Sequence, residues 1–198
     1  MSGGFLGNAG TFLISVFFGA YILLVMLRFI MQWQRADFYN PMSQFIVKIT
    51  NPPLIPLRKL IPGFAGLDFA AVLLMLVLQF IELGLIAYIS LGHIPNLLGL
   101  LIWSLGELIN LFLMVYIVGM IILAIVSWVS PQGHSPVLSL VHQIIDPLLF
   151  QFRKVIPPMS GLDLSVFFAL IVLFLIKMFN DYTIIFQGQQ LIKSTAIF

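Results

Sequence analysis

Residues 51–68 read NPPLIPLRKLIPGFAGLD, and residues 146–163 read DPLLFQFRKVIPPMSGLD. Both stretches have a proline at the second position, an Arg-Lys pair at the eighth and ninth, and a final Gly-Leu-Asp triplet. The spacing between them is 95 residues, and it aligns the two halves without a gap from about Tyr21 to Ile81. It also pairs Trp33 with Trp128 and Pro41 with Pro136. Prolines and polar residues match less readily by chance than apolar residues do, so the sequence predicts a tandem duplication.

The composition indicates a membrane protein. Hydrophobic residues make up 61% of the chain and charged residues 8%, whereas a soluble domain has about a quarter charged residues. Most of the apolar surface must therefore face lipid. The net charge of +2 gives no indication of a nucleic-acid partner. The chain has no cysteine, which excludes disulfides, thiolate metal sites and covalent haem attachment.

We predict an all-α membrane protein with four transmembrane helices, because a span needs about 20 apolar residues. The first repeat, residues 1–92, has spans at about 11–31 and 69–91, and the second, residues 93–198, has spans at about 105–129 and 164–182. No basic residue precedes the first apolar run, so this run is expected to remain as a helix rather than be cleaved as a signal peptide. Residues 94–103 contain Pro95 and Gly99 and are expected to form an interfacial lead-in, with a fifth, partial span as the alternative.

Basic residues predict the orientation in the membrane. The segment between the two spans of each repeat contains an Arg-Lys pair, whereas residues 91–103 contain neither lysine nor arginine. Both connecting segments are therefore expected to be cytoplasmic and both termini periplasmic. Two spans per repeat mean that the repeats insert in parallel, unlike the inverted repeats of many transporters. Arg28 lies near the cytoplasmic end of its span and is expected to snorkel to the interface.

Each connecting segment, or connector, is predicted to form an interfacial amphipathic helix. Apolar residues recur every three or four positions over residues 42–49 and 137–144, with polar residues on the other face. These helices are expected to begin at Pro41 and Pro136 and to end before Pro52 and Pro147. They would lie in the headgroup plane and direct their basic pairs toward anionic lipid or a partner. These pairs are Arg58 with Lys59 and Arg153 with Lys154. A soluble loop is the alternative, and it would expose the apolar faces to water.

Asp68 and Asp163 stand where each connector enters a span, and we predict that both are helix N-caps. Ion pairs with Arg58 and Arg153 are compatible with that role, and ion binding is the alternative. Glu82 and Lys177 are equivalent in the two repeats and lie about 21 Å beyond these aspartates, in the outer half of the membrane.

Glu82, Lys177 and Glu107 form a candidate intramembrane polar cluster, because ionisable residues at such depth usually have partners or functions. A Glu82–Lys177 pair would hold the two halves in register. An ion or proton pathway is one alternative, and snorkelling to the outer interface is another. The sequence contains no motif of a nucleotide-binding loop, zinc protease or serine hydrolase. We therefore predict no enzyme, and no catalytic, cofactor or metal site.

The duplicated pattern resembles the YggT family, also called YlmG-like. The resemblance rests on residues 28–33 (RFIMQW) and 37–41 (DFYNP) and on the two connector motifs quoted above. It covers nearly the whole chain, in the two-copy arrangement typical of proteobacterial members. The second copy departs from the first in having Leu123 where the first has Arg28.

The resemblance implies a bacterial inner-membrane protein that contributes to osmotic stress tolerance and to potassium or ion homeostasis. Relatives elsewhere are linked to cell division, to nucleoid or membrane organisation and, in plastids, to haem attachment on a cytochrome. The alternative is therefore a membrane scaffold or assembly factor that acts through its basic connectors. The expected partners are anionic headgroups at the cytoplasmic face, a second copy of the chain or an unidentified protein, and no nucleic acid.

Overall fold

The structure, a computed structural model, describes residues 4–64, 66–129, 135–155 and 163–194, which are almost entirely helical. The elements are α1 (Phe5–Trp33), α2 (Pro41–Leu60), α3 (Phe69–Leu91), α4 (Leu97–Val129), α5 (Pro136–Val155), α6 (Leu164–Asn180), the π-helix η1 (Asp181–Ile185) and α7 (Phe186–Ser194). Within the described ranges, four helical segments are long and apolar enough to cross a membrane: Phe5–Trp33, Phe69–Leu91, Leu97–Ser127 and Leu164–Lys193. The predicted all-α class and the four long apolar helices are confirmed.

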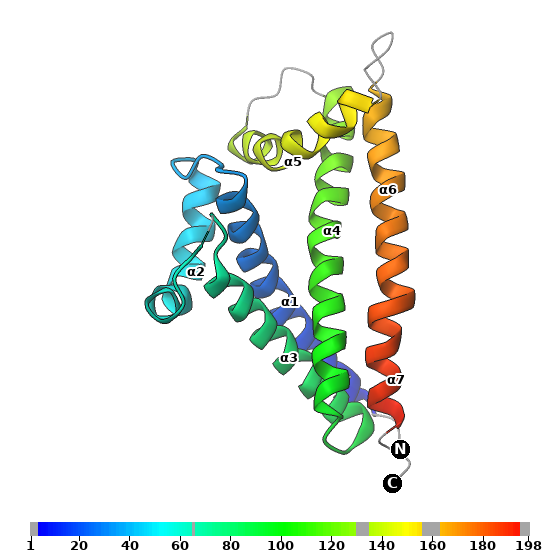
Figure 1. Cartoon of the computed structure of the whole chain (residues 1–198). Coiled ribbons are helices and arrows are strands. Elements are labelled where there is room, and N and C mark those ends of the chain that lie inside the picture. The colour runs from blue at the N-terminus through cyan, green and yellow to red at the C-terminus, as the bar shows by residue number, and fades with distance from the viewer. Residues whose placement is uncertain (1–3, 65, 130–134, 156–162, 195–198) are drawn as a thin grey trace.

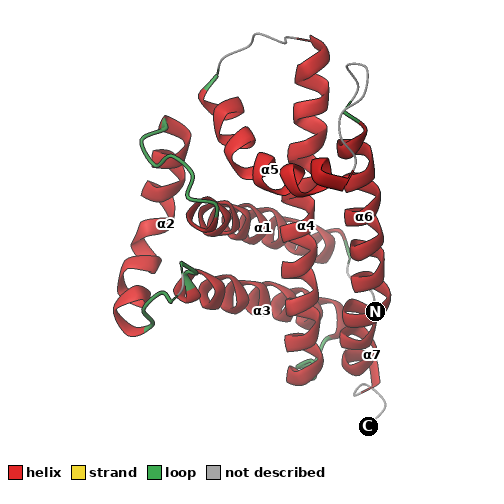
Figure 2. Ribbon diagram, turned by 45° about the horizontal axis from the view of Figure 1, so that its top comes forward, coloured by secondary structure: helices red, strands yellow, loops and turns green. Residues whose placement is uncertain are grey.

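The connectors α2 and α5 lie away from the end of the molecule where both termini are found (Figure 1). Helices α1 and α4 run from the terminal end toward the connectors, and α3 and α6 return. Helices α1 and α3 lie side by side, and α2 joins their ends (Figure 2). Helix α4 stands between this pair and the α6–α7 segment and packs against both. The sense in which the two repeats insert into a bilayer stays a prediction.

The main apolar core lies where the long helices meet, and the connectors close it at one end. Ile22 and Ile30 of α1, Met75 of α3 and Ile117 of α4 are almost completely buried in it. Leu149 of α5 is buried in the same core. The lipid-facing sides of these helices are apolar as well, as expected where the surrounding solvent is hydrocarbon. Because no side of these helices is polar, packing against neighbouring helices determines which side faces the protein interior.

Both connector helices continue through prolines at which the sequence predicts that they end, so that prediction is wrong. The helix interiors contain four prolines, namely Pro52, Pro53 and Pro56 in α2 and Pro147 in α5. A proline inside a helix removes the amide that would bond the carbonyl four residues earlier. Pro53 lies four residues after Ile49 and has no amide hydrogen, so the Ile49 carbonyl has no backbone donor in the helix. The Tyr21 hydroxyl of α1 donates to this carbonyl instead, at 3.4 Å. A contact with the neighbouring span thus replaces one of the bonds that the prolines remove.

A single helix, α4, includes residues 97–103, so the predicted interruption of the helix at Gly99 is wrong, whereas the interfacial position of these residues stays a prediction. The side-chain oxygen of Asn96 accepts from the amides of Leu98 and Gly99 at 2.9 and 3.1 Å and starts the helix. Gly99 does not interrupt the helix, because its role is to let α7 approach. A Cβ atom on Gly99 would lie only 2.9 Å from the Gly188 carbonyl oxygen. Small residues permit this close approach of two backbones within a membrane.

The last span is also longer than predicted, since the chain stays helical to Ser194 rather than ending near residue 182. The π-helix η1 is inserted between α6 and α7. There the Thr183 hydroxyl donates to the Phe179 carbonyl at 2.6 Å. Short π-helical insertions interrupt the regular hydrogen-bond ladder and occur frequently at functional sites.

Candidate functional site

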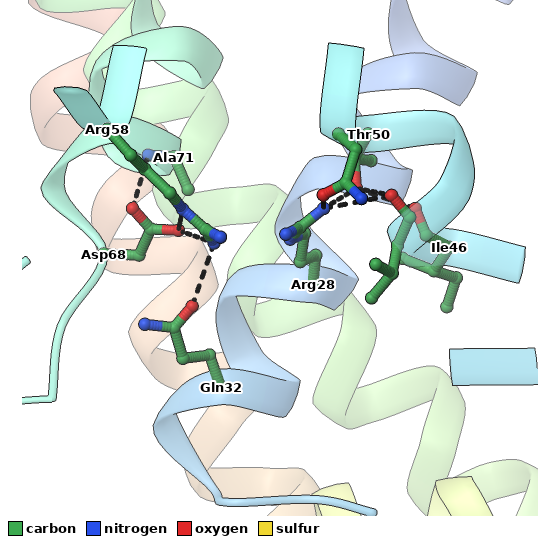
Figure 3. Close-up of polar contacts among 9 residues, drawn as sticks. Arg28, Gln32, Ile46, Thr50, Arg58, Asp68 and Ala71 are labelled. Carbon is green, nitrogen blue, oxygen red and sulfur yellow. Dashed lines mark hydrogen bonds and ion pairs between the residues drawn. The ribbon is translucent and has the colours of Figure 1, made fainter. Parts of the chain in front are cut away.

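Asp68 joins the end of the first connector to the start of α3 (Figure 3). Its Oδ1 accepts from the backbone amide of Ala71 at 3.2 Å, which caps α3. Its Oδ2 accepts from Arg58, with Nε at 3.0 Å and Nη2 in closer contact. Arg58 Nη2 also donates to Gln32 Oε1 of α1 at 3.1 Å. The Asp68 side chain is 2% exposed, so a buried carboxylate ties α2 to α3 while the arginine reaches α1.

The second repeat has a more exposed version of the same junction. Arg153 donates to Asp163 Oδ2 through Nε at 2.9 Å and Nη2 at 2.7 Å. Asp163 Oδ1 accepts from the Ser165 amide at 3.1 Å and from the Ser165 hydroxyl, which caps α6. Partial burial by itself would raise the pKa of Asp163, but the bonds from Ser165 and Arg153 outweigh it and leave the pKa below its ordinary value. We call these two junctions the Arg–Asp anchors.

The two members of each basic pair therefore have different surroundings. Arg58 and Arg153 turn toward the protein and form the anchors. Lys59 and Lys154 are exposed, and the Lys154 ammonium lies 4.7 Å from the centre of the Phe150 ring. The lysines are thus exposed whereas the arginines form ion pairs, and contact of the basic pairs with lipid or a partner stays a prediction.

Arg28 is buried, so the prediction that it snorkels to the interface is wrong. The residue is 5% exposed, and its Nη1 donates to the Val47 carbonyl at 3.1 Å, to Thr50 Oγ1 at 2.8 Å and to Asn51 Oδ1 at 2.7 Å (Figure 3). These acceptors lie on the turn just before Pro52, where the prolines leave carbonyls without backbone donors. Such a turn resembles the negative end of a helix, which favours a cation. Arg28 Nε is buried, and within the described residues it has no hydrogen-bond partner.

The three ionisable residues of the predicted intramembrane cluster each have a local partner. Lys177 Nζ pairs with Asp181 Oδ2 at 2.7 Å, one turn along the same helix. Glu82 is buried and accepts from Gln79 at 3.1 Å. Glu107 accepts from the Trp103 indole at 2.9 Å. In the part of the chain that the structure describes, Lys177 thus pairs with Asp181 and not with Glu82, because a partner at i+4 is within reach of a single helix.

Asn180 and Asp181 belong to this region, and the sequence analysis missed both of them. Asn180 Nδ2 donates to the Gly106 carbonyl at 2.9 Å and to Asn110 Oδ1 at 2.8 Å. Asn110 Nδ2 donates to Asp181 Oδ1 at 2.6 Å, so a polar network joins α4 to the junction of α6 and η1. Asn180 Oδ1 is buried without a hydrogen-bond partner among the described residues. The sequence feature that could have indicated them is the Asn-Asp pair inside an otherwise apolar run.

The sequence model of the CCB3/YggT family matches the chain twice, at residues 7–89 and 102–184. The second match begins and ends 95 residues after the first, which is the predicted repeat spacing. The chain belongs to the CCB3/YggT family.

Similar proteins cover most of the chain. An uncharacterised protein of Pseudomonas aeruginosa is 48% identical over 174 residues, 87% of this chain and 88% of that protein. The uncharacterised protein YggT of Escherichia coli K12 is 38% identical over 174 residues, 86% of this chain and 88% of that protein. A protein of Vibrio alginolyticus is 44% identical over 162 residues, 80% of this chain and 86% of that protein. No solved structure matches the chain.

The two YggT repeats differ around the proline-rich turn of the connector. Equivalent positions have different residues, with Pro53 and Arg28 in the first repeat against Leu148 and Leu123 in the second. Leu148 supplies the amide that Pro53 lacks. Tyr116, the equivalent of Tyr21, accepts from Gln34 Nε2 at 3.0 Å instead of bonding to the connector. The additional proline and the buried arginine therefore occur together in the first repeat, and both are leucine in the second.

The two connectors of the YggT fold also contact one another. Asn40 caps α2 by accepting from the Met42 amide at 2.9 Å, and it donates to the Pro136 carbonyl at 2.7 Å. The Asp37 amide donates to Gln143 Oε1 of α5 at 2.5 Å. The start of α2 is therefore bonded directly to α5, and the two connectors form one surface at their end of the molecule.

Proposed function

We propose that this YggT-family protein is a non-enzymatic membrane scaffold whose connectors, α2 and α5, form a docking platform on the cytoplasmic face of a bacterial inner membrane. The termini would then be periplasmic. The observation that carries this proposal is the pair of Arg–Asp anchors, which fix each connector to the spans while Lys59 and Lys154 stay exposed. A platform of this kind requires a surface that keeps its shape when a partner binds.

Several contacts support a platform of constant shape. The C-terminal end of each connector is fixed by an Arg–Asp anchor, and at their N-terminal ends Asn40 bonds the two connectors together. Preorganisation of this kind lowers the entropy lost on binding. Bonds to the spans should also transmit any movement of the connectors into the membrane.

The exposed side chains of the connectors suit a position at the bilayer surface. Phe45 and Val137 are about half exposed, and they would enter the acyl region of the interface. His142 and Asp146 lie on another face of α5, with side chains 51% and 48% exposed. An apolar side toward lipid and a polar side toward the cytoplasm would leave the polar side available for a protein partner or anionic headgroups.

The experiment separates the exposed lysines from the structural arginines. In the triple variant Lys48→Gln, Lys59→Gln, Lys154→Gln, the anchors stay intact while the exposed positive charge of the connectors falls. We expect this variant to lose retention of anionic lipid and in-cell cross-linking to partners, and to fail in complementing a deletion strain under hyperosmotic stress. Lys193→Gln, an exposed lysine at the other end of the molecule, is the control. Full complementation and partner retention by the triple variant would exclude the platform.

A second candidate is a direct role in ion homeostasis that supports osmotic stress tolerance. The network of Asn110, Lys177, Asn180 and Asp181 favours it, because charged and amide groups inside a membrane often mark a path for ions or protons. Purified protein in proteoliposomes should then conduct a cation, and Asp181→Asn should reduce the flux while leaving the fold intact. A lack of flux from the reconstituted wild-type protein would exclude direct transport and leave the scaffold.

A further inference from the structure

A groove lies between the two repeats, within the apolar part of the molecule. Leu23 and Leu27 of α1 form one side, α4 forms the opposite side, and α5 contributes a third. The groove has a volume of about 340 Å³, and every residue that lines it is apolar or a glycine. It lies apart from the Arg–Asp anchors and from the intramembrane polar network, since none of their residues lines it.

Gly119 explains why the groove is closed by α5. A Cβ atom on Gly119 would lie 2.5 Å from Ile145 Cδ1, so the glycine lets α5 settle directly onto α4. Val141 and Ile145 then form part of the lining from α5. The equivalent of Gly119 in the first repeat is Leu24, whose side chain packs against the core. The groove is therefore a feature of the second repeat where it meets α1.

The position of the groove determines what can fill it. Its lining residues Leu23, Met114 and Val118 belong to segments that can cross a membrane, and they remain 37%, 39% and 45% exposed. A water molecule needs two to four polar partners, which an apolar groove does not offer. Hydrocarbon chains are the solvent at this depth, and they have no polar groups to satisfy.

We propose that this groove binds one acyl chain of a phospholipid and holds it between the two repeats. The walls bury the chain on three sides, whereas an ordinary lipid-facing surface contacts a chain on one side only. A bound chain would fill the space between α1 and α4 and join the repeats across it. The proposal does not rest on the docking platform, because it needs neither the exposed lysines nor a protein partner.

The test compares two identical substitutions at similarly exposed methionines. Met114→Trp fills the groove, whereas Met178→Trp places the same side chain on α6, where Met178 is 55% exposed and does not line the groove. Protein released from membranes in mild detergent is examined by native mass spectrometry. We expect one phospholipid per chain on the wild-type protein and on Met178→Trp. Occupancy should fall about tenfold in Met114→Trp, since losing even two buried methylene groups weakens binding by roughly that factor.

A milder filling variant, Val118→Phe, covers the case in which Met114→Trp does not fold, and it should lower occupancy in the same direction. Retention of the phospholipid by folded Met114→Trp or Val118→Phe would overturn the proposal. So would a wild-type protein that carries no phospholipid. Because the chain has no cysteine, Val118→Cys tests for a second copy as the occupant, and a disulfide-linked dimer in membranes would also overturn the proposal. The triple lysine variant should keep this lipid even where the platform fails.

Discussion

The guanidinium of Arg58 donates to the carboxylate of Asp68, and the same carboxylate accepts the first-turn amide of Ala71. One buried side chain thus starts a membrane-spanning helix and holds the connector that precedes it. Asp163 has the same two roles with Arg153 and Ser165. Because each aspartate combines the two roles, its removal should disturb both the span and the connector.

Asp68→Ala should be more destabilising than Asp163→Ala. The Asp68 side chain is 2% exposed against 28% for Asp163, so loss of Asp68 removes the carboxylate partner of Arg58 at a more buried position. We expect a loss of about 3 kcal/mol for Asp68→Ala, the lower end for breaking a buried pair, and about 1 kcal/mol for Asp163→Ala. Unfolding in detergent, followed by circular dichroism, measures both. Equal losses would mean that burial does not set the strength of the anchors.

Asp163 should make the second anchor sensitive to acid. Its pKa in the folded protein is below the ordinary value because bonds from Ser165 and Arg153 outweigh burial. The anchor therefore contributes stability above the unfolded pKa of about 3.9, and this contribution is lost as the pH falls through that value and below. The free energy of unfolding measured from pH 6 to pH 3 should fall less steeply in Asp163→Asn than in the wild type. Ser165→Ala removes one of the bonds and should give an intermediate slope.

Arg28→Leu should destabilise the first connector, although leucine is the residue at the equivalent position of the second repeat. The change removes the donor to Val47, Thr50 and Asn51 at the proline-rich turn. We expect a loss of about 1.5–3 kcal/mol, the range for a hydrogen bond that involves a charged group. Arg28→Lys keeps the charge and should lose less. Limited proteolysis at residues 41–60 is the measurement, and unchanged protection in Arg28→Leu would contradict this role.

Gly188→Ala should separate α4 from α7. A Cβ atom at Gly188 would lie 2.6 Å from the Trp103 amide nitrogen, which is backbone and cannot rotate away. We expect a destabilisation of about 1–3 kcal/mol, as for other overpacked sites. Gly19→Ala in α1 is the matched control, because nothing lies within 4 Å of a Cβ there. The control should raise stability by about 0.5–1 kcal/mol through helix propensity. The two substitutions should therefore change the free energy of unfolding in opposite directions.

Arg35→Gly should stabilise the end of α1. Arg35 has a φ of 55°, and the Ala36 amide bonds the Met31 carbonyl at 2.9 Å, which is the pattern of a helix end that glycine usually occupies. We expect a gain of at most about 1 kcal/mol in unfolding free energy. Arg35→Ala removes the same charge without relieving the backbone and should show no gain. A gain in both variants would attribute the effect to charge instead.

The repeat spacing and the number of spans followed from the sequence because prolines and polar residues are rare in so apolar a chain. A match of several of them at one spacing is therefore informative, and the family match at the same spacing confirms it. The positions of Asp68 and Asp163 before apolar runs likewise carry a local signal, since capping depends on the first turn alone.

Partner choice, in contrast, was decided by the tertiary structure. Arg28 bonds to α2, Asn180 bonds to α4, and Gly99 and Gly188 bring α4 against α7. These contacts depend on how each helix is rotated about its axis, and helices that are apolar on all sides carry no periodic pattern that reveals this rotation. The same limitation explains the errors at α4 and the connectors. The local conformational preferences of glycine and proline predict that a helix ends, whereas packing against a neighbouring helix keeps these segments helical.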